Sequence, residues 1–186
     1  MKGNLAGGNN DIDLVKQFKN GDIRGYNEIV RKYQQQVYWI IRKIVQDHDE
    51  TDDITQEVFI KVHSALRDFR EESNLFTWLY RIATNFAINH VRKVKVKNTV
   101  SIEVVSEVEY GEKKADELID DERQRKILEE AIEKLPPKQR AVFNMRYYDE
   151  LPYDEISNIL GKSVGGVKAN YFHAVKKIGG YVKGKL

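Results

Sequence analysis

Residues 151–178 read LPYDEISNILGKSVGGVKANYFHAVKKI. A short amphipathic run ends at Gly161, the chain turns over three residues, and a second run follows that is apolar on one side and basic on the other. Two short helices joined in this way are typical of a helix-turn-helix, in which the second helix enters the major groove of DNA. The stretch therefore predicts a DNA-reading unit, and the other residues must indicate what it is attached to.

Single residues explain the predicted turn. Gly161 can end the first helix in the left-handed conformation at little cost, and Ser163 can cap the second helix. Gly165 and Gly166 each weaken that helix by about 1 kcal/mol, which close approach of the backbone to a phosphate would explain. The predicted inward stripe consists of Val164, Val167, Tyr171, Ala174 or Val175, and Ile178. A plain helical hairpin would explain the stripe but not an outer face without acidic residues.

The composition excludes several classes of protein. The 186 residues include no cysteine, which excludes a disulfide framework, a zinc finger and a cysteine nucleophile. No apolar run reaches membrane-spanning length, and residues 1–10 lack the apolar core of a signal peptide. We therefore expect a cytoplasmic protein without membrane insertion.

The net charge of +2 conceals a strong segregation of charge along the chain. Residues 47–57 contain six acids and no Lys or Arg, whereas residues 80–98 contain five basic residues and no acid. Residues 103–122 contain nine acids against two lysines, and residues 156–186 contain six lysines and no acid. Two basic segments separated by acidic ones indicate two surfaces for a polyanion and at least one surface for another partner.

Hydrophobic periodicity predicts an all-α protein built from two small helical domains. Residues 1–10 are rich in Gly and Asn and predict a disordered N-terminus. A helical bundle is expected over residues 11–95. Its predicted parts are helices at 11–20, 26–44, 54–69 and 75–93, a polar turn at 47–53, and a polar loop at 70–74 in which Ser73 or Asn74 can cap the next helix.

The helical period breaks at residues 94–111. Residues 100–105 have the composition of a short strand, but acids interrupt the pattern, so residues 96–120 predict an acidic linker. Helices are expected again at about 115–134 and at 138–148. Pro136 and Pro137 separate them, because proline disfavours helix in the residue before it and can begin the next helix. The second domain then comprises residues 121–186.

Two long groups of residues carry a resemblance to a known family. The C-terminal group consists of Leu135-Pro136, Arg140, Val142-Phe143, Arg146, Leu151, Tyr153, Glu155-Ile156, Leu160-Gly161, Gly165, Val167-Lys168, Ala174 and Lys177. The N-terminal group consists of Asp53, Gln56 to Phe59, Lys61-Val62, Phe69-Arg70, Phe76 to Ala83, Asn85 and Ala87. The first group resembles the promoter-binding C-terminal domain of bacterial sigma factors, most of all the extracytoplasmic-function (ECF) class. The second resembles the sigma segments that dock on the RNA polymerase clamp and open the promoter.

This resemblance implies a binding protein rather than an enzyme, with no catalytic residue, cofactor or metal. An ECF sigma factor binds the clamp and flap of core RNA polymerase, recognises the minus-ten and minus-thirty-five promoter elements, and nucleates strand opening. ECF factors are commonly held by an anti-sigma factor. Because the chain shows no intervening sigma domain, the linker is expected to thread the polymerase. The acids of residues 103–121 would then mimic nucleic acid in the template channel.

The resemblance assigns polymerase docking to the second bundle helix. The predicted polymerase-binding residues are Asp52, Asp53, Gln56, Glu57 and Lys61. Acids at a helix N-terminus also stabilise the helix dipole, so the residues alone favour a structural role, and the resemblance favours docking.

Aromatic residues alternate with cations between Phe76 and Lys93. Aromatic faces stack on unpaired bases while cations follow phosphates, although Phe86 and Phe76 fit a core role better. The resemblance implies that the loop from Phe69 to Asn74 holds a base flipped from the minus-ten element, where a carboxylate can accept a hydrogen bond from a cytosine amino group. The predicted minus-ten residues are Phe69, Arg70, Glu71, Glu72, Ser73, Asn74, Trp78, Arg81, Asn85, Arg92 and Lys93.

The second helix of the helix-turn-helix carries the predicted minus-thirty-five residues. They are Lys162, Ser163, Val164, Gly165, Gly166, Lys168, Ala169, Asn170, Phe172, His173, Lys176 and Lys177. The family often has Ser or Thr at position 169 and arginines at 170 and 173, so this chain departs from it at three groove-facing positions. Ala169 and Phe172 can contact thymine methyl groups, and Asn170 can read adenine. A neutral His173 adds less phosphate affinity than arginine.

Two other functions stay open at the level of sequence. A helix-turn-helix repressor or activator would carry a ligand pocket or a dimer helix in the N-terminal half, whereas residues 70–93 have the pattern of a nucleic-acid surface. A metal-dependent nuclease would hold magnesium with clustered carboxylates. The carboxylates at hand are Asp47, Asp49, Asp52, Asp53 and Glu57, but the four histidines are scattered and no catalytic motif accompanies the acids.

Overall fold

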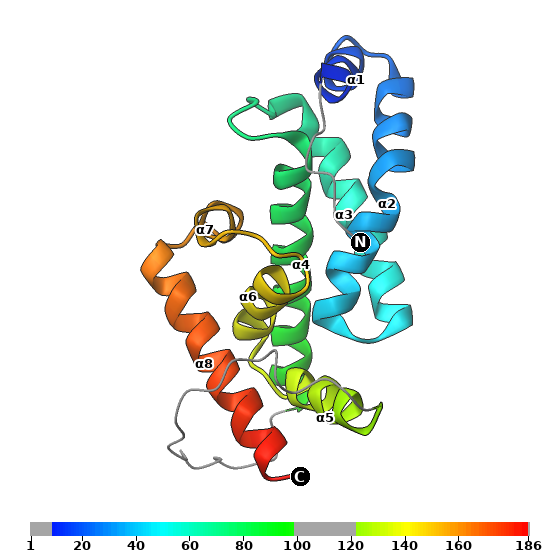
Figure 1. The fold of residues 1–186 in the computed structure, drawn as a ribbon. Helices are drawn as coiled ribbons and strands as arrows, with labels where there is room; N and C mark the ends of the chain where they lie inside the picture. The colour runs from blue at the N-terminus through cyan, green and yellow to red at the C-terminus, as the bar shows by residue number, and fades with distance from the viewer. Residues whose placement is uncertain (1–8, 99–121, 186) are drawn as a thin grey trace. The chain divides into compact units, whose positions relative to one another are not determined.

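The computed structural model describes residues 9–98 and 122–185 (Figure 1). Every regular element in these ranges is helical, which confirms the predicted fold class. The order is α1 (Asn9–Lys19), α2 (Ile23–Val45), α3 (His48–Ala65), the 3-10 helix η1 (Leu66–Asp68), α4 (Leu75–Asn98), α5 (Glu122–Glu133), α6 (Pro137–Tyr147), α7 (Tyr153–Leu160) and α8 (Val164–Lys183). Two compact units divide between Val91 and Arg92, near the end of α4.

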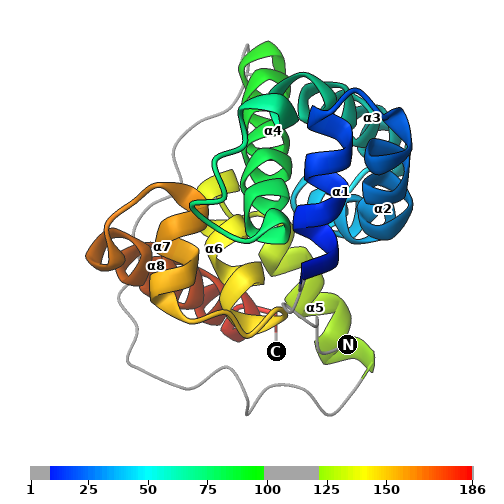
Figure 2. The ribbon, with the colours of Figure 1, turned by 90° about the horizontal axis from the view of Figure 1, so that it is seen from above.

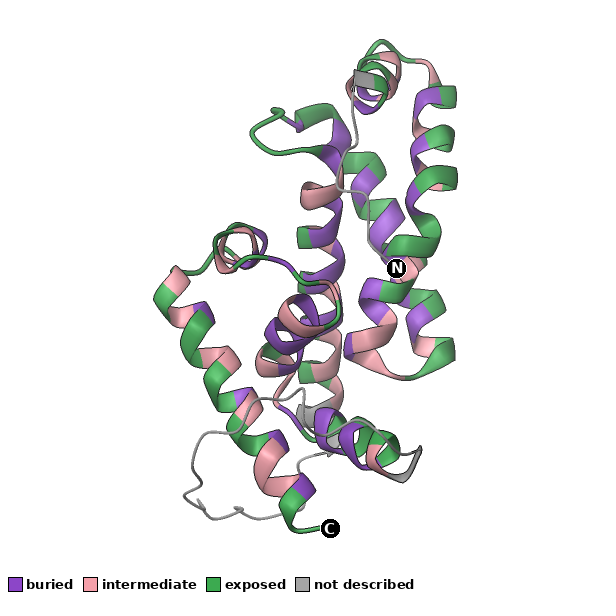
Figure 3. Ribbon diagram, in the orientation of Figure 1, coloured by how far each residue is buried: buried purple, intermediate pink, exposed green. Residues whose placement is uncertain are grey.

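In the N-terminal unit, α1 packs on α2 and α2 packs on α3, and Figure 2 shows α1 and α2 side by side. The repeat of apolar residues at helical spacing places one stripe of α2 in the core. Its buried members are Gly25, Ile29, Tyr33, Val37, Ile40, Ile41 and Ile44. Buried residues recur along α4 as well (Figure 3), so these helices form the bundle expected from the hydrophobic pattern.

The first turn of α3 differs from the prediction. A polar turn was expected over residues 47–53, but the helix already begins at His48. The Asp47 carboxylate caps it by accepting a hydrogen bond of 2.9 Å from the Glu50 N–H. Acids in the first turn favour helix because they face the positive end of the helix dipole. The cluster of acids therefore starts the helix rather than preceding it.

Two more helix boundaries differ from the expected ones. Helix α1 begins at Asn9, inside the stretch predicted to be disordered, and α4 continues to Asn98 rather than ending near Lys93. The valines after Lys93 interrupt the helical period of apolar residues, which predicted that the helix ends there. Basic residues near the C-terminus of a helix stabilise it through the helix dipole, which favours a longer helix. The predicted linker acids, the strand-like residues 100–105 and the start of the helix expected from 115 lie outside the described residues.

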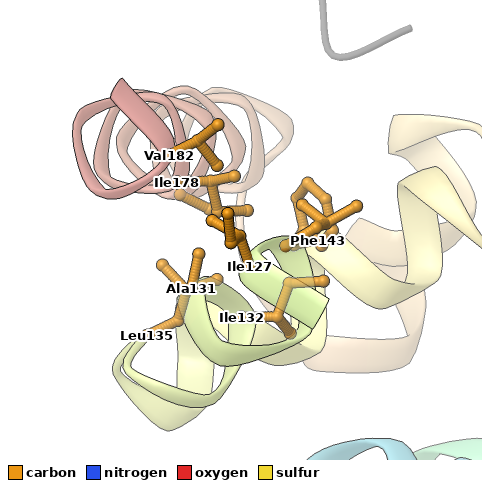
Figure 4. Close-up of a cluster of buried hydrophobic side chains, with 9 residues drawn as sticks. Ile127, Ala131, Ile132, Leu135, Phe143, Ile178 and Val182 are labelled. Atoms are coloured by element: carbon orange, nitrogen blue, oxygen red, sulfur yellow. The ribbon is translucent and has the colours of Figure 1, made fainter. Parts of the chain in front are cut away.

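The C-terminal unit has its own core, formed mainly by α5, α6 and α8. Figure 4 shows the side chains that meet there, from Ile127 on α5 to Phe143 on α6 and Val182 on α8. The buried cluster comprises Ile127, Leu128, Ala131, Ile132, Leu135, Phe143, Ala174, Ile178 and Val182. Pro137 is the first residue of α6, as its fixed φ predicts.

Candidate nucleic-acid interface

The turn between α7 and α8 has the predicted geometry. Gly161 ends α7 with φ 59° and ψ 43°, in the left-handed region that favours glycine. Ser163 then caps α8, because its Oγ accepts a hydrogen bond of 3.2 Å from the Gly166 N–H. These two residues fix the direction in which α8 leaves the turn.

Helix α8 has two distinct faces (Figure 3). One face packs into the core through Val167, Ala174 and Ile178. The opposite face exposes the predicted groove residues Lys168, Ala169, Phe172, His173, Lys176 and Lys177. The Phe172 side chain is 54% exposed, although phenylalanine is among the residues most often fully buried. The exposed face carries cations and an aromatic ring but no acid.

The two glycines at the start of α8 are in different surroundings. A Cβ added at Gly165 would meet no protein atom within 4 Å, whereas one at Gly166 would lie 3.2 Å from the Ser163 hydroxyl. Gly166 thus leaves room for the cap. At Gly165 the open space points away from the protein, where a phosphate can approach the backbone.

Asn170 makes a hydrogen bond inside its own helix. Its Nδ2 donates a hydrogen bond of 2.7 Å to the Gly166 carbonyl, within its own helix. This bond uses one of the two Nδ2 hydrogens, and the second hydrogen and Oδ1 are the donor and acceptor that a bidentate contact with adenine requires. Val164, also predicted to contact DNA, is half-buried at the start of the same helix.

The loop at residues 70–74 joins η1 to α4 and is exposed throughout. Glu71 has φ 60°, a left-handed conformation that is uncommon for a residue with a side chain. Asn74 caps α4, because its Oδ1 accepts a hydrogen bond of 2.7 Å from the Thr77 N–H. Of the two cap candidates in the sequence, Asn74 therefore fills the position.

Phe69 requires a correction. The sequence placed it among the residues that contact minus-ten DNA, but its side chain is only 5% exposed. The Phe69 ring packs against Trp78, with ring centroids 5.1 Å apart and planes tilted by 53°, so little of it is open to a base. Tyr80, another aromatic of the alternating pattern, is also buried. Side chains on the outer side of α4 are therefore better placed to meet DNA.

The outer side of α4 presents a row of polar residues. Arg81, Asn85 and Arg92 are exposed at helical spacing, with Lys93 beside them and Trp78 half-buried at the start of the row. Asn89 is exposed in the same row and was missing from the predicted set. Its spacing from Asn85 would have identified it.

The exposed face of α3 carries the predicted docking residues together with an apolar one. Asp52, Asp53, Gln56, Glu57 and Lys61 are exposed. Ile60 lies among them and is 72% exposed. The sequence contained a signal for this, because Ile60 falls off the inward stripe of Ile54, Val58 and Val62. Ile60 is thus the apolar member of an otherwise polar exposed face.

Arg140 belongs to the core rather than to a binding surface. Its guanidinium is buried and donates hydrogen bonds to the carbonyls of Glu133 and Leu135, at the end of α5. Burial lowers the pKa of the guanidinium from its ordinary value, while the charge of Glu133 opposes that change. The arginine thus joins the end of α5 to α6.

The described residues contain no group of His, Cys, Asp and Glu that could hold a metal ion. The acids of α3 point outward along a helix instead of converging on one point, which does not favour the nuclease alternative. Among the helices of the described part of the chain, none is long and apolar enough to cross a membrane.

Two family models match the chain in the order of its two units. Residues 29–96 match the model described as "Sigma-70 region 2", and residues 125–178 match "Sigma-70, region 4". The chain is 33% identical to the RNA polymerase sigma-H factor of Pseudomonas aeruginosa over 178 residues, which cover 90% of this chain and 91% of that protein. It is 34% identical to the ECF RNA polymerase sigma-E factor of Escherichia coli K12 over 180 residues, which cover 90% and 92%.

Solved structures show the same fold. The structure of CnrH in complex with the cytosolic domain of CnrY matches with a TM-score of 0.66 at 20% identity, covering 96% of this chain and 100% of that one. The sigma factor RpoE of Bartonella quintana, in complex with the anti-sigma factor NepR, matches with a TM-score of 0.61 at 18% identity, covering 85% and 96%.

Proposed function

The chain belongs to the ECF sigma factors of RNA polymerase, which recognise promoters and initiate transcription, and we propose how its side chains divide this work. The C-terminal unit holds the minus-thirty-five element, the outer side of α4 and the 70–74 loop hold the minus-ten element, and α3 holds the polymerase. The observation that carries the proposal is the contrast between the two faces of α8, one packed in the core and the other exposed, basic and free of acids.

The exposed face of α8 divides into positioning and reading contacts. Lys168, Lys176 and Lys177 neutralise phosphates and set the register of the helix, which makes binding fall steeply with salt. Ala169 and Phe172 supply apolar contacts to thymine methyl groups. Reading of bases therefore depends on few side chains, and phosphate contacts supply most of the affinity.

The outer row of α4 meets the unpaired strand. Arg81, Arg92 and Lys93 follow the phosphates, and the half-buried Trp78 lies at the start of the row. The 70–74 loop receives the flipped base, with Glu71 or Glu72 as the acceptor for an exocyclic amino group.

The α3 face binds core polymerase through a polar rim around Ile60. Such an arrangement resembles the centre of many protein interfaces, in which a few apolar anchors carry most of the binding energy and polar neighbours exclude water. The partner surface should be basic with an apolar socket, because Asp53, Gln56 and Glu57 surround the isoleucine.

We further propose a cytoplasmic location and control by an anti-sigma factor. CnrH was solved with the cytosolic domain of CnrY, and the RpoE of Bartonella quintana was solved with the anti-sigma factor NepR. An anti-sigma factor that covers the α3 face or the α8 face of this chain would block a contact needed for initiation.

In-vitro transcription tests the proposal. The purified chain and core RNA polymerase would be incubated with a library of genomic fragments, and the start sites would be mapped. We expect start sites that share two spaced motifs. The variant Phe172→Ala should change only the upstream motif and Asn85→Ala only the downstream one. Absence of any polymerase-dependent product, or a change of both motifs by either variant, would contradict the division of work.

A further inference from the structure

Helix α1 has no part in the contacts proposed so far, and it precedes the residues that match the region 2 family model. Its last residue nevertheless contacts the residue that precedes the 70–74 loop. The Lys19 Nζ donates a hydrogen bond of 2.6 Å to the carbonyl of Phe69, fifty residues along the chain. Phe69 immediately precedes the loop, and a hydrogen bond with a charged donor is stronger than one between neutral groups.

The other end of α1 is connected to the far side of the same loop. Asp11 is only 2% exposed, and it accepts hydrogen bonds of 2.6 Å from the Tyr33 hydroxyl and 2.5 Å from the Lys32 Nζ. The Tyr33 ring stacks on Phe76, with centroids 5.7 Å apart and planes 25° apart. Phe76 lies two residues after Asn74, where the loop ends. One helix is thus connected to both flanks of the loop.

Helix α1 is itself held firmly against α2 and α3. A Cβ at Gly25 of α2 would collide with the carbonyl of Leu14, so only glycine permits this approach of the two helices. At the end of α1, the Phe18 ring meets the Tyr26 ring at 5.7 Å and the His63 ring at 5.1 Å. A fixed α1 can therefore hold the loop ends in place rather than move with them.

The loop needs such support to present a base pocket. Residues 70–73 are exposed, and Glu71 adopts a left-handed backbone that costs free energy. Ordering exposed residues costs conformational entropy. A loop whose ends are fixed in advance loses less entropy when it closes on a base.

We propose that α1 is a clamp that orders the 70–74 loop for base recognition, with Lys19 and Asp11 as positioning residues. This inference rests on the proposed role of the loop at the minus-ten element. Neither residue touches DNA in this account, so their effect is on the shape of the pocket and not on its charge.

The test compares base discrimination. The probe is a fluorescein-labelled single strand carrying the downstream motif of a promoter found by the transcription experiment, with each base replaced in turn. The ratio of dissociation constants for replaced and original bases does not depend on the fraction of folded protein. We expect Lys19→Met in the full chain to reduce the largest ratio about five- to tenfold, because the hydrogen bond that it removes contributes about 1–1.5 kcal/mol.

Two variants control for charge and chemistry. Lys16→Met removes the same charge from an exposed position of the same helix and should leave the ratio unchanged. Lys19→Arg retains a charged donor and should restore most of the discrimination. An unchanged ratio in Lys19→Met, or an equal loss in Lys16→Met, would overturn the clamp.

A measurement without DNA separates failure of the clamp from failure of the proposed function. In a Trp39→Phe background, Trp78 is the only tryptophan, and it packs on Phe69. We expect Lys19→Met to increase acrylamide quenching of Trp78, and unchanged quenching would contradict the clamp. Lys19→Met could increase the quenching of Trp78 while the parent chain shows no base preference. In that case the proposed role of the loop in DNA recognition is wrong, but the connection between α1 and the loop is confirmed.

Discussion

Replacement of Gly165 by alanine should stabilise the C-terminal unit and weaken its binding to DNA. Gly165 is in the first turn of α8, where an added Cβ would meet no protein atom within 4 Å. Alanine is favoured over glycine by about 1 kcal/mol in a helix interior, and we expect about 0.5 kcal/mol in the first turn. If a phosphate lies against this backbone, the methyl group should cost about 1 kcal/mol of binding, or about fivefold in the dissociation constant.

The two effects are measured separately on the full chain. Affinity is followed by fluorescence anisotropy with a minus-thirty-five duplex at one fixed salt concentration, because phosphate contacts depend on salt. Stability is followed by urea unfolding. Trp39 and Trp78 both lie in the N-terminal unit, so tryptophan fluorescence reports that unit, whereas far-ultraviolet circular dichroism reports both. The stabilisation should therefore appear in circular dichroism and not in fluorescence.

Gly179 provides the matched control. It lies in the same helix and also has open space around an added Cβ, but it lies beyond the groove residues. Gly179→Ala should stabilise the unit by about 0.5–1 kcal/mol and leave affinity for DNA unchanged. If Gly165→Ala binds DNA as well as the parent chain, the backbone at Gly165 does not approach a phosphate.

Three further predictions concern separate parts of the chain. Ile60→Ser should weaken binding to core polymerase about tenfold or more without lowering the melting temperature, whereas Ile23→Ser, also at an exposed site, should not affect binding. Ser163→Ala should lower the stability of the C-terminal unit by about 1 kcal/mol in urea unfolding, and an unchanged midpoint would contradict the capping role. Burial and the hydrogen bond to Asp11 raise the pKa of Tyr33 above its ordinary value of 10.0. The stabilisation from its protonated hydroxyl is thus fully present below that value and is lost as pH rises through the raised pKa. The midpoint of urea unfolding, followed by tryptophan fluorescence, should therefore decrease as the pH is raised above 10. The decrease should be less steep in Tyr33→Phe.

The parts of the fold that depend on local rules could be predicted from the sequence. Gly161 and Ser163 have specific backbone and capping roles, so the turn before α8 was predictable to the residue. The end of α4 was not, because its alternating valines and lysines are compatible with both helix and irregular chain. In that case context outweighs local preference.

The exposed residues of the candidate site were predictable where exposure follows helical spacing. They were not predictable where contacts between distant segments determine which side chains are buried. The exposed face of α8 follows from the position of its apolar stripe. Phe69 and Trp78 looked equivalent in the sequence, and only the fold shows that Phe69 is buried and Trp78 half-buried. The bond between Lys19 and Phe69 spans fifty residues, and no periodicity of either segment indicates it.

The separation of the two faces of α8 has a consequence for the evolution of promoter preference. Ala169, Phe172 and His173 are exposed and contribute little to the core, so substitutions there should change stability by no more than about 0.5 kcal/mol. A lineage can therefore exchange these residues one at a time and acquire a new set of target genes without passing through an unstable intermediate. The buried stripe of Val167, Ala174 and Ile178 has no such freedom. Divergence among descendants should accordingly concentrate on the face that meets DNA.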